Sequence, residues 1–159
     1  MSVSIAGADF GTTKQRVLFV CVHNSGRSQM AEALLRRLGG DRFEAESAGL
    51  EPGELNLLVV AAMHEIGIDI SRARTKSVSD LSKRGLEFDC VVTVCDEASA
   101  ERCPAFPGTA RKRLHWSFAD PAQLPGTSKE RLAGTRAIRD QIKAKIEEFL
   151  SSAGGKKPG

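Results

Sequence analysis

The chain has 159 residues, and its content of 41% hydrophobic and 27% charged residues is typical of a single globular domain. The net charge of +3 is small and the basic residues are dispersed, so we expect no nucleic-acid binding, which needs a clustered basic patch. Residues 1–15 lack the features of an export signal, and no apolar run is long enough to span a membrane. These features predict a cytoplasmic protein that does not associate with membranes.

The ends of the chain and its cysteines suggest how it is organised. We expect a flexible extension over residues 1–15, a folded domain over 16–150 and a flexible tail over 151–159. Structural disulfides are disfavoured in a reducing compartment, so metal binding, redox chemistry and nucleophilic catalysis are the roles to consider for the cysteines. The chain has four of them: Cys21, Cys90, Cys95 and Cys103.

The first half of the chain predicts a strand, a helix and a second strand. The apolar run "RVLFV" at 16–20 is typical of a strand, and "FEAES" at 43–47 is a second candidate. Between them, Met30, Leu34 and Leu38 recur at every fourth position, which predicts the buried face of a helix.

The middle of the chain continues the alternation. Asn56 can cap a helix that ends at Gly67. The segment "FDCVVTV" at 88–94 is apolar on both faces, as in a strand buried in the middle of a parallel sheet. The segment "RKRLHW" at 111–116 predicts a weaker fourth strand.

The last helix has the clearest start, because Thr127 and Glu130 have the spacing of a capping box. Strands that alternate with helices predict an α/β fold, here a doubly wound parallel sheet of four strands flanked by helices. The buried stripe of the last helix is expected to consist of Leu132, Ile138, Ile142, Ile146 and Phe149.

Three residues with reactive side chains each follow one of the predicted strands. They are Cys21, Cys95 and Asp120. Ligands of open parallel sheets bind beyond the carboxyl ends of the strands, so we expect these three side chains at one edge of the sheet.

The loop "CVHNSGRS" at 21–28 has residues that are typical of an oxyanion-binding site. A loop that enters a helix presents backbone N–H groups and the positive end of the helix dipole. Asn24 and Gly26 tolerate the left-handed backbone angles that turn these N–H groups inward, and Arg27 offers a planar fork for two oxygens. The same positive field favours the thiolate of Cys21, which is the nucleophilic form. The expected oxyanion-binding residues are Val22, His23, Asn24, Ser25, Gly26, Arg27 and Ser28.

These residues also allow other interpretations. The loop lacks the Gly-Lys-Ser/Thr ending of a nucleotide-binding loop. His23 either lines the mouth of the loop, which is the simpler interpretation, or tunes the thiolate. Cys90 lies inside an apolar strand and is expected to be inert. A zinc site is disfavoured because the spacing of its four possible ligands matches no compact zinc pattern; these are Cys90, Cys95, Cys103 and His115.

The segment "FVCVHNSGRSQMAEALL" resembles the signature loop of the low-molecular-weight protein tyrosine phosphatase superfamily. Within it, "NSGRSQMAE" resembles the arsenate reductases of that superfamily more than its phosphatases. The segments "SAG", "GIDIS", "VVTVCDEA" and "HWSFADPA" continue the resemblance in the same order over residues 16–150. The resemblance implies the superfamily's fold and a catalytic Cys21, Arg27 and Asp120.

For a reductase, the resemblance implies a relay of thiols. Cys21 would attack arsenate with assistance from Asp120, Cys95 would then attack Cys21, and Cys103 would take over the oxidation as a Cys95–Cys103 disulfide. An external thiol reductant, thioredoxin or another thiol-redox protein, would reduce that disulfide. No tightly bound cofactor and a monomeric protein are expected.

Two other functions stay open on the sequence alone. A phosphatase for aryl phosphates would use Cys21 and Asp120 without the other cysteines, although the chain has no tyrosine and one tryptophan to line an aromatic pocket. A non-catalytic oxyanion-binding module would not need Cys21, Arg27 and Asp120 together.

The chain departs from the best-known three-cysteine reductases at two places. Gly26 stands where those proteins carry a cysteine that the relay does not use, and the interval from Cys95 to Cys103 is one residue longer. The resemblance also implies a possible potassium ion behind the loop, since oxygen ligands suit a hard cation. Its ligands would be Asn24, Glu32, Ser47 and Asp69.

Overall fold

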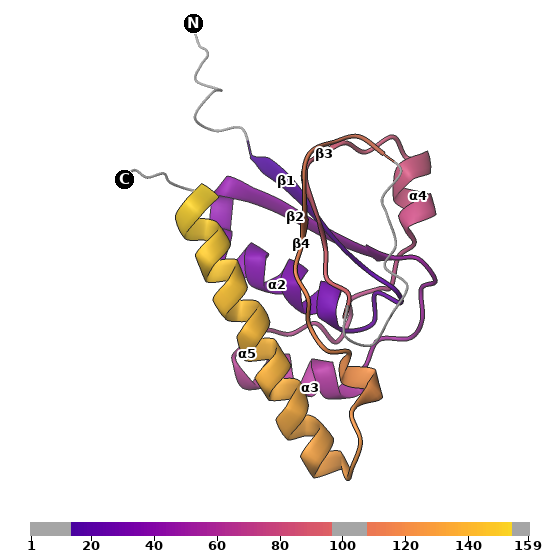
Figure 1. The fold of residues 1–159 in the computed structure, drawn as a ribbon, viewed down its shortest axis with the longest axis vertical. Helices are drawn as coiled ribbons and strands as arrows, with labels where there is room; N and C mark the ends of the chain where they lie inside the picture. The colour runs from indigo at the N-terminus through magenta and orange to yellow at the C-terminus, as the bar shows by residue number, and fades with distance from the viewer. Residues whose placement is uncertain (1–13, 97–107, 154–159) are drawn as a thin grey trace, which may run out of the picture.

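The computed structural model describes residues 14–96 and 108–153, with helices packed on both faces of one parallel sheet (Figure 1). Its four strands have the order β2-β1-β3-β4, and all neighbouring pairs are parallel. The expected doubly wound α/β fold is therefore confirmed. The strands are β1 (Gln15–Cys21), β2 (Phe43–Gly49), β3 (Phe88–Thr93) and β4 (Ala110–His115).

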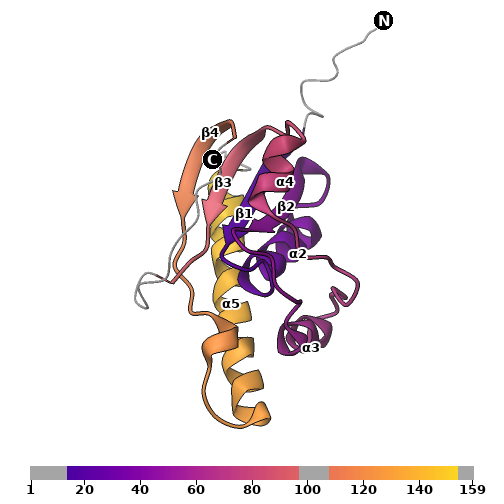
Figure 2. The same cartoon turned by 90° about the vertical axis from the view of Figure 1, so that its right-hand side faces the viewer.

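The helices divide unequally between the two faces of the sheet (Figures 1 and 2). The larger core lies between one face and the helices α2, α3 and α5, whereas α4 covers a smaller core on the other face. The long helix α5 runs the length of the molecule (Figure 1). The bounds are α2 (Arg27–Gly39), α3 (Leu57–Glu65), α4 (Val78–Lys83) and α5 (Ser128–Ala153), with short 3-10 turns η1 (Gly40–Arg42) and η3 (Pro121–Gln123).

Each predicted strand and helix is present within a few residues of its expected bounds. The caps are also as expected. The Asn56 side chain accepts hydrogen bonds from the N–H groups of Leu58 and Val59. Thr127 and Glu130 bond each other reciprocally, with N···O distances of 2.8 and 3.1 Å, at the start of α5.

Two expected core positions and one helix differ from the sequence prediction. Leu38 shares the apolar face of α2 but lies in its last turn, and 37% of its surface is exposed. Leu132 is half-buried, near the start of α5, while the rest of the predicted stripe is buried. The sequence did not reveal α4, whose six residues are too few to show a helical repeat.

Trp116 follows β4 and lies in the larger core. Its ring centroid is 5.8 Å from that of Phe19 in β1 and 5.9 Å from that of Phe149 in α5. The single tryptophan thus joins the sheet to α5. Within the part of the chain that the structure describes, no helix has the length and apolar character needed to cross a membrane.

Candidate functional site

The oxyanion loop, residues 21–28, runs from the last residue of β1 to the first two residues of α2 and surrounds a buried thiol. Cys21 ends β1, and 2% of its surface is exposed. Its Sγ accepts a hydrogen bond from the N–H of Asn24 at 3.2 Å and lies 2.8 Å from Oγ of Ser28. Two polar groups, the Asn24 N–H and the Ser28 hydroxyl, therefore contact the sulfur.

Asn24 holds the oxyanion loop in shape. Its φ of 56° is the only positive φ of a non-glycine residue among residues 14–96 and 108–153, as the sequence predicted for this position. Its amide nitrogen donates to Ser28 Oγ at 2.7 Å, and its Oδ1 accepts from the Gln29 side chain and from the Lys76 N–H. A left-handed backbone angle was expected at Gly26 as well, and this was wrong, because the φ of Gly26 is −146°.

The carbonyl groups of the oxyanion loop are bound from outside by the segment 50–56. The N–H groups of Leu50, Glu51, Gly53 and Asn56 donate to the carbonyl oxygens of Cys21, Val22, His23 and Ser25, in that order, at 2.8–3.2 Å. Because these carbonyls face outward, the loop can turn backbone N–H groups toward its interior, which is the arrangement of an anion-binding nest.

Gly49, at the end of β2, allows this close approach. A Cβ built there would lie 2.8 Å from main-chain atoms of Val22, His23 and Asn24. Such a contact is too short for any side chain, so position 49 must be glycine. The motif "SAG" gives no sign of this requirement, because it depends on a loop that is distant in the chain.

Arg27 and Asp120 lie close together, so Asp120 is next to the loop that follows β1, in agreement with its predicted place at the same sheet edge as Cys21. The Arg27 guanidinium is 3% exposed; it donates to the Phe118 carbonyl at 3.1 Å and lies 3.6 Å from Asp120 Oδ2. The other carboxylate oxygen, Oδ1, accepts from the Ala122 N–H at the start of η3. One side of Asp120 is thus fixed, while its Oδ2 faces the arginine.

The cysteines differ in their placement. Cys95 lies just beyond β3 and is buried. The residue before it, Val94, donates its N–H to the Val20 carbonyl of β1. Cys21 and Cys95 therefore follow neighbouring strands at the same edge of the sheet. Neighbouring strands of a sheet are about 4.8 Å apart. None of Cys21, Cys90 and Cys95 forms a disulfide, and Cys103 lies outside the described residues.

Cys90 is part of the core within β3. Burial away from water disfavours its charged form and raises the pKa of the Cys90 thiol from 9.0 to about 11. This agrees with the expectation of an inert thiol.

His23 is exposed at the mouth of the oxyanion loop. Its Nδ1 lies 2.9 Å from the carbonyl oxygen of Glu51, so the ring is anchored to the segment that supports the loop. This contact fits the simpler of the two interpretations, in which His23 lines the mouth.

A family model described as low molecular weight phosphotyrosine protein phosphatase matches residues 16–157. The chain belongs to this family. Within the family it groups with the arsenate reductases. The arsenate reductase of Halalkalibacterium halodurans is 42% identical to this chain over 140 residues, a match that covers 87% of this chain and 97% of that protein.

Solved structures of family members agree with this assignment. An arsenate reductase in its phosphate-binding state has a TM-score of 0.71 and 29% identity, covering 86% of this chain and 96% of its own. A thioredoxin-dependent arsenate reductase of Corynebacterium glutamicum has a TM-score of 0.60 and 32% identity, covering 89% of this chain and 62% of its own.

The residues considered for potassium do not fit such an ion. Ser47 Oγ donates to Glu32 Oε1 at 2.5 Å, so these two side chains do lie together. However, the Lys76 ammonium lies 3.6 Å from the same carboxylate oxygen and already supplies a positive charge there. Asn24 Oδ1 already accepts two hydrogen bonds from nitrogen donors. Asp69 is exposed and accepts from the N–H of Ser71.

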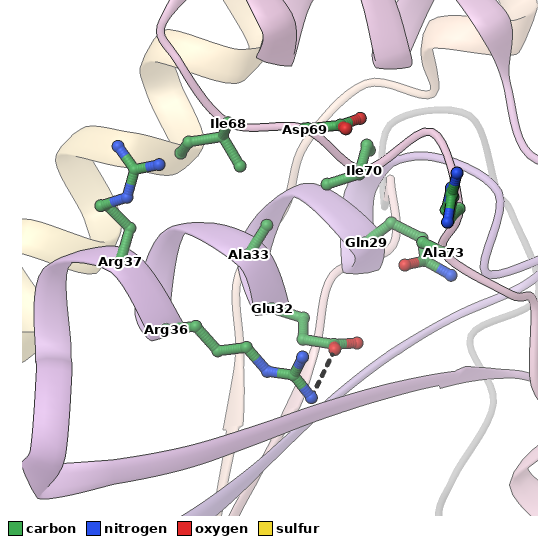
Figure 3. Close-up of a pocket in the computed structure, with 10 residues that line it drawn as sticks. Gln29, Glu32, Ala33, Arg36, Arg37, Ile68, Asp69, Ile70 and Ala73 are labelled. Atoms are coloured by element: carbon green, nitrogen blue, oxygen red, sulfur yellow. Dashed lines mark ion pairs between the residues drawn. The ribbon is translucent and has the colours of Figure 1, made fainter.

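Figure 3 shows where these carboxylates lie, on the pocket of about 530 Å³ beside α2. The Asp69 carboxylate is well apart from that of Glu32, which pairs with Arg36. The four predicted ligands therefore do not converge on one point. No group of three or more His, Cys, Asp and Glu side chains in the described ranges could hold a metal ion.

Two residues that were not predicted as part of the site, Gln29 and Lys76, support the oxyanion loop. Gln29 donates to Asn24 Oδ1 at 3.0 Å and to the Arg74 carbonyl at 2.9 Å, and it lies directly after the oxyanion loop in the quoted motif. Lys76 reaches the loop from 52 positions away. The motif could have indicated Gln29, whereas only the folded chain places Lys76.

Proposed function

We propose that this protein reduces arsenate to arsenite by means of the Cys21 thiol and a relay through Cys95 and Cys103. The observation that carries the proposal is the placement of Cys21 and Cys95 at the ends of adjacent parallel strands, next to an arginine-bearing loop. Phosphate-ester hydrolysis uses the first thiol alone, whereas reduction needs a second thiol close by.

The first step is nucleophilic attack by Cys21. Its thiolate sulfur forms a bond to the arsenic atom of arsenate, whose oxygens are bound by the N–H groups of the oxyanion loop and by Arg27. Asp120 gives a proton to the oxygen that leaves as water. Its Oδ2 lies 3.6 Å from the Arg27 guanidinium, which is expected to hold the same anion. The product is a Cys21–arsenic(V) adduct.

The second step is the reduction itself. The Cys95 thiolate attacks the sulfur of Cys21, and the electron pair of the sulfur–arsenic bond passes to arsenic, which leaves as arsenite. A Cys21–Cys95 disulfide remains. Cys103 then attacks the sulfur of Cys95 and releases the Cys21 thiolate, so the oxidation is transferred to a Cys95–Cys103 disulfide. Both electrons come from the thiols.

An external dithiol completes the cycle. Only 1% of the surface of Cys95 is exposed, so a protein reductant cannot reach the Cys21–Cys95 disulfide in the described conformation. Transfer of the oxidation to a Cys95–Cys103 disulfide would therefore have to be accompanied by a rearrangement that brings this disulfide to the surface. We propose thioredoxin or another small thiol-redox protein as the reductant, and a monomer suffices because every step uses one chain.

The alternative of an aryl phosphatase is less well supported. A phenyl ring needs an apolar wall beside the catalytic thiol. The single tryptophan, Trp116, is 8% exposed and packs in the core, and the chain has no tyrosine. Phosphatase activity is therefore expected as a side activity, since the Cys21 and Arg27 geometry would also bind phosphate.

The test is to add arsenate to the fully reduced protein without reductant and to titrate the remaining thiols. One pair of thiols is expected to disappear, and peptide mapping should find the disulfide between Cys95 and Cys103. Cys21→Ser should lower turnover with thioredoxin by roughly a thousandfold or more, since it removes the nucleophile.

Cys90→Ser is the matched control, because it removes a cysteine that the relay does not use. It should keep the loss of one thiol pair. Full turnover by Cys95→Ser with thioredoxin would show that the relay is wrong. Rapid hydrolysis of p-nitrophenyl phosphate without loss of thiols would favour the phosphatase, and phosphate binding without either reaction would favour a binding module.

A further inference from the structure

Glu32 is a buried carboxylate directly behind the oxyanion loop. It lies in the second turn of α2, and 8% of its surface is exposed. Oε1 accepts from Ser47 Oγ at 2.5 Å, and Oε2 lies 2.9 Å from the Arg36 guanidinium. A buried carboxylate requires such compensation, because desolvation of a charge is costly unless the charge is paired.

The third partner of Glu32 is the ammonium group of Lys76. Its Nζ lies 3.6 Å from Glu32 Oε1 and donates to the Arg74 carbonyl at 3.3 Å. The ammonium thus contacts a carboxylate oxygen and a carbonyl oxygen, which are the kinds of ligand that a hard monovalent cation would also use.

The main chain of Lys76 is fixed to the catalytic loop from both sides. Its N–H donates to Asn24 Oδ1 at 2.9 Å, and its carbonyl accepts from the Gly49 N–H at 2.8 Å. Asn24 in turn donates to Ser28 Oγ and, from its N–H, to Cys21 Sγ. A short chain of hydrogen bonds therefore connects Lys76 with the reactive sulfur.

Charge counting argues against an additional cation here. Arg36 and Lys76 together carry two positive charges against the one negative charge of Glu32, so a metal ion would enter a region that is already net positive. Arg36 is also held by the Ala45 carbonyl, at 2.9 Å from its Nη2, and 56% of its side chain is exposed. The ammonium of Lys76, with 27% of its side chain exposed, is the more enclosed of the two.

We propose that Lys76 is a positioning residue whose ammonium replaces the monovalent metal ion behind the oxyanion loop. The ammonium neutralises Glu32 and the main-chain N–H holds Asn24 in place, so the pairing with Glu32 fixes the segment that supports the loop without potassium. The stability readout of this inference is independent of the proposed function, whereas its oxyanion-binding readout depends on it.

The experiment compares the wild-type protein with Lys76→Met, which keeps the aliphatic stem and removes the charge. Melting temperatures and inorganic phosphate affinities are measured at equal ionic strength in potassium, sodium or tetramethylammonium chloride. The wild type should give the same values in all three salts. Lys76→Met should bind phosphate about tenfold more weakly in tetramethylammonium, and potassium should restore most of that loss.

Three further variants sharpen the result. Lys83→Met removes an exposed lysine from α4 and should behave as the wild type. Lys76→Arg retains a cation and should stay insensitive to the choice of salt. The double variant Glu32→Gln with Lys76→Met should lose the response to potassium, because the carboxylate that attracts the ion is gone.

A wild-type protein that melts higher or binds phosphate more tightly in potassium than in both other salts would overturn the proposal. So would a Lys76→Met variant that matches the wild type in tetramethylammonium. If Lys76→Met does not fold, the wild type and Lys76→Arg still decide the question by their response to potassium. Absence of phosphate binding by the wild type would contradict the proposed function, and the melting temperatures would still test Lys76.

Discussion

At the scale of single residues, the contrast between Cys21 and Cys90 shows how environment decides the role of a thiol. Cys21 ends β1 with two polar groups at its sulfur, whereas Cys90 lies one strand away among apolar side chains. Burial raises the pKa of Cys90 to about 11. The two thiols are therefore expected to react very differently with the same reagent.

Cys90 should resist alkylation by iodoacetamide until strongly alkaline pH. With a pKa of about 11, roughly 0.1% of it is thiolate at pH 8, and burial limits access further. Mass spectrometry of each cysteine peptide over a pH series measures the rate of alkylation, with protein in urea as the control. Since the folded pKa of Cys90 lies above its unfolded value, the free energy of unfolding should also fall as the pH rises from about 9 to about 11. Labelling of Cys90 at pH 8 as fast as in urea would contradict the expectation.

Residue chemistry also explains what could be read from the loop sequence. The left-handed angle of Asn24 and the Arg27–Asp120 proximity follow from local preference and from the rule for parallel sheets. The need for glycine at position 49 and the contribution of Lys76 arise from contacts across the fold. A single sequence gives no local signal for contacts of that kind.

At the scale of elements, helix caps determine where the helices begin. The pKa of Glu130 is lowered, chiefly because its carboxylate accepts the Thr127 N–H. Gly126, just before the cap, has a φ of 104°, and a Cβ there would lie 2.6 Å from Glu130 Oε1. The capping box was legible in the sequence because both partners lie within one turn, whereas α4 was missed because it is short.

Thr127→Ala should lower the free energy of unfolding by about 1 kcal/mol, the usual cost of a lost N-cap. Because the pKa of Glu130 is lower in the folded state, its contribution is complete above the unfolded pKa and is lost as the pH falls through the folded pKa. The stability difference between wild type and Glu130→Ala should therefore narrow in acid. Urea unfolding near pH 7 and pH 3 measures it.

Glu130→Gln is the control for that experiment, since glutamine keeps the capping geometry without a titrating group. Its difference from Glu130→Ala should change little with pH. A gap between wild type and Glu130→Ala that widens in acid would contradict the assignment of the cap.

At the scale of the whole molecule, one aromatic contact joins the sheet to the longest helix. Trp116 packs between Phe19 and Phe149, and ion pairs of Arg136 and Arg139 with Glu65 join α5 to α3. The alternation of strands and helices was sufficient to predict the fold class. It could not predict that α5 would serve as a common support for α2 and α3, because that depends on packing between helices.

Trp116→Ala should lower the free energy of unfolding by about 3–5 kcal/mol, because it leaves a large cavity in the main core. Trp116→Phe should cost less, since it retains a ring between the same neighbours. Urea unfolding followed by far-UV circular dichroism measures both changes. A loss of less than about 1 kcal/mol in Trp116→Ala would mean that the core can close around the missing ring.

The carbonyl pairing between the oxyanion loop and residues 50–56 has a consequence for how the protein can change. Those contacts use main-chain atoms on both sides, so the exposed side chains at positions 51–54 can vary while the loop keeps its shape. Substitutions at exposed positions such as Glu51 can alter what approaches the mouth and leave the thiol untouched. An insertion or deletion in this segment would shift every donor out of register. The segment therefore tolerates new chemistry but not a new length.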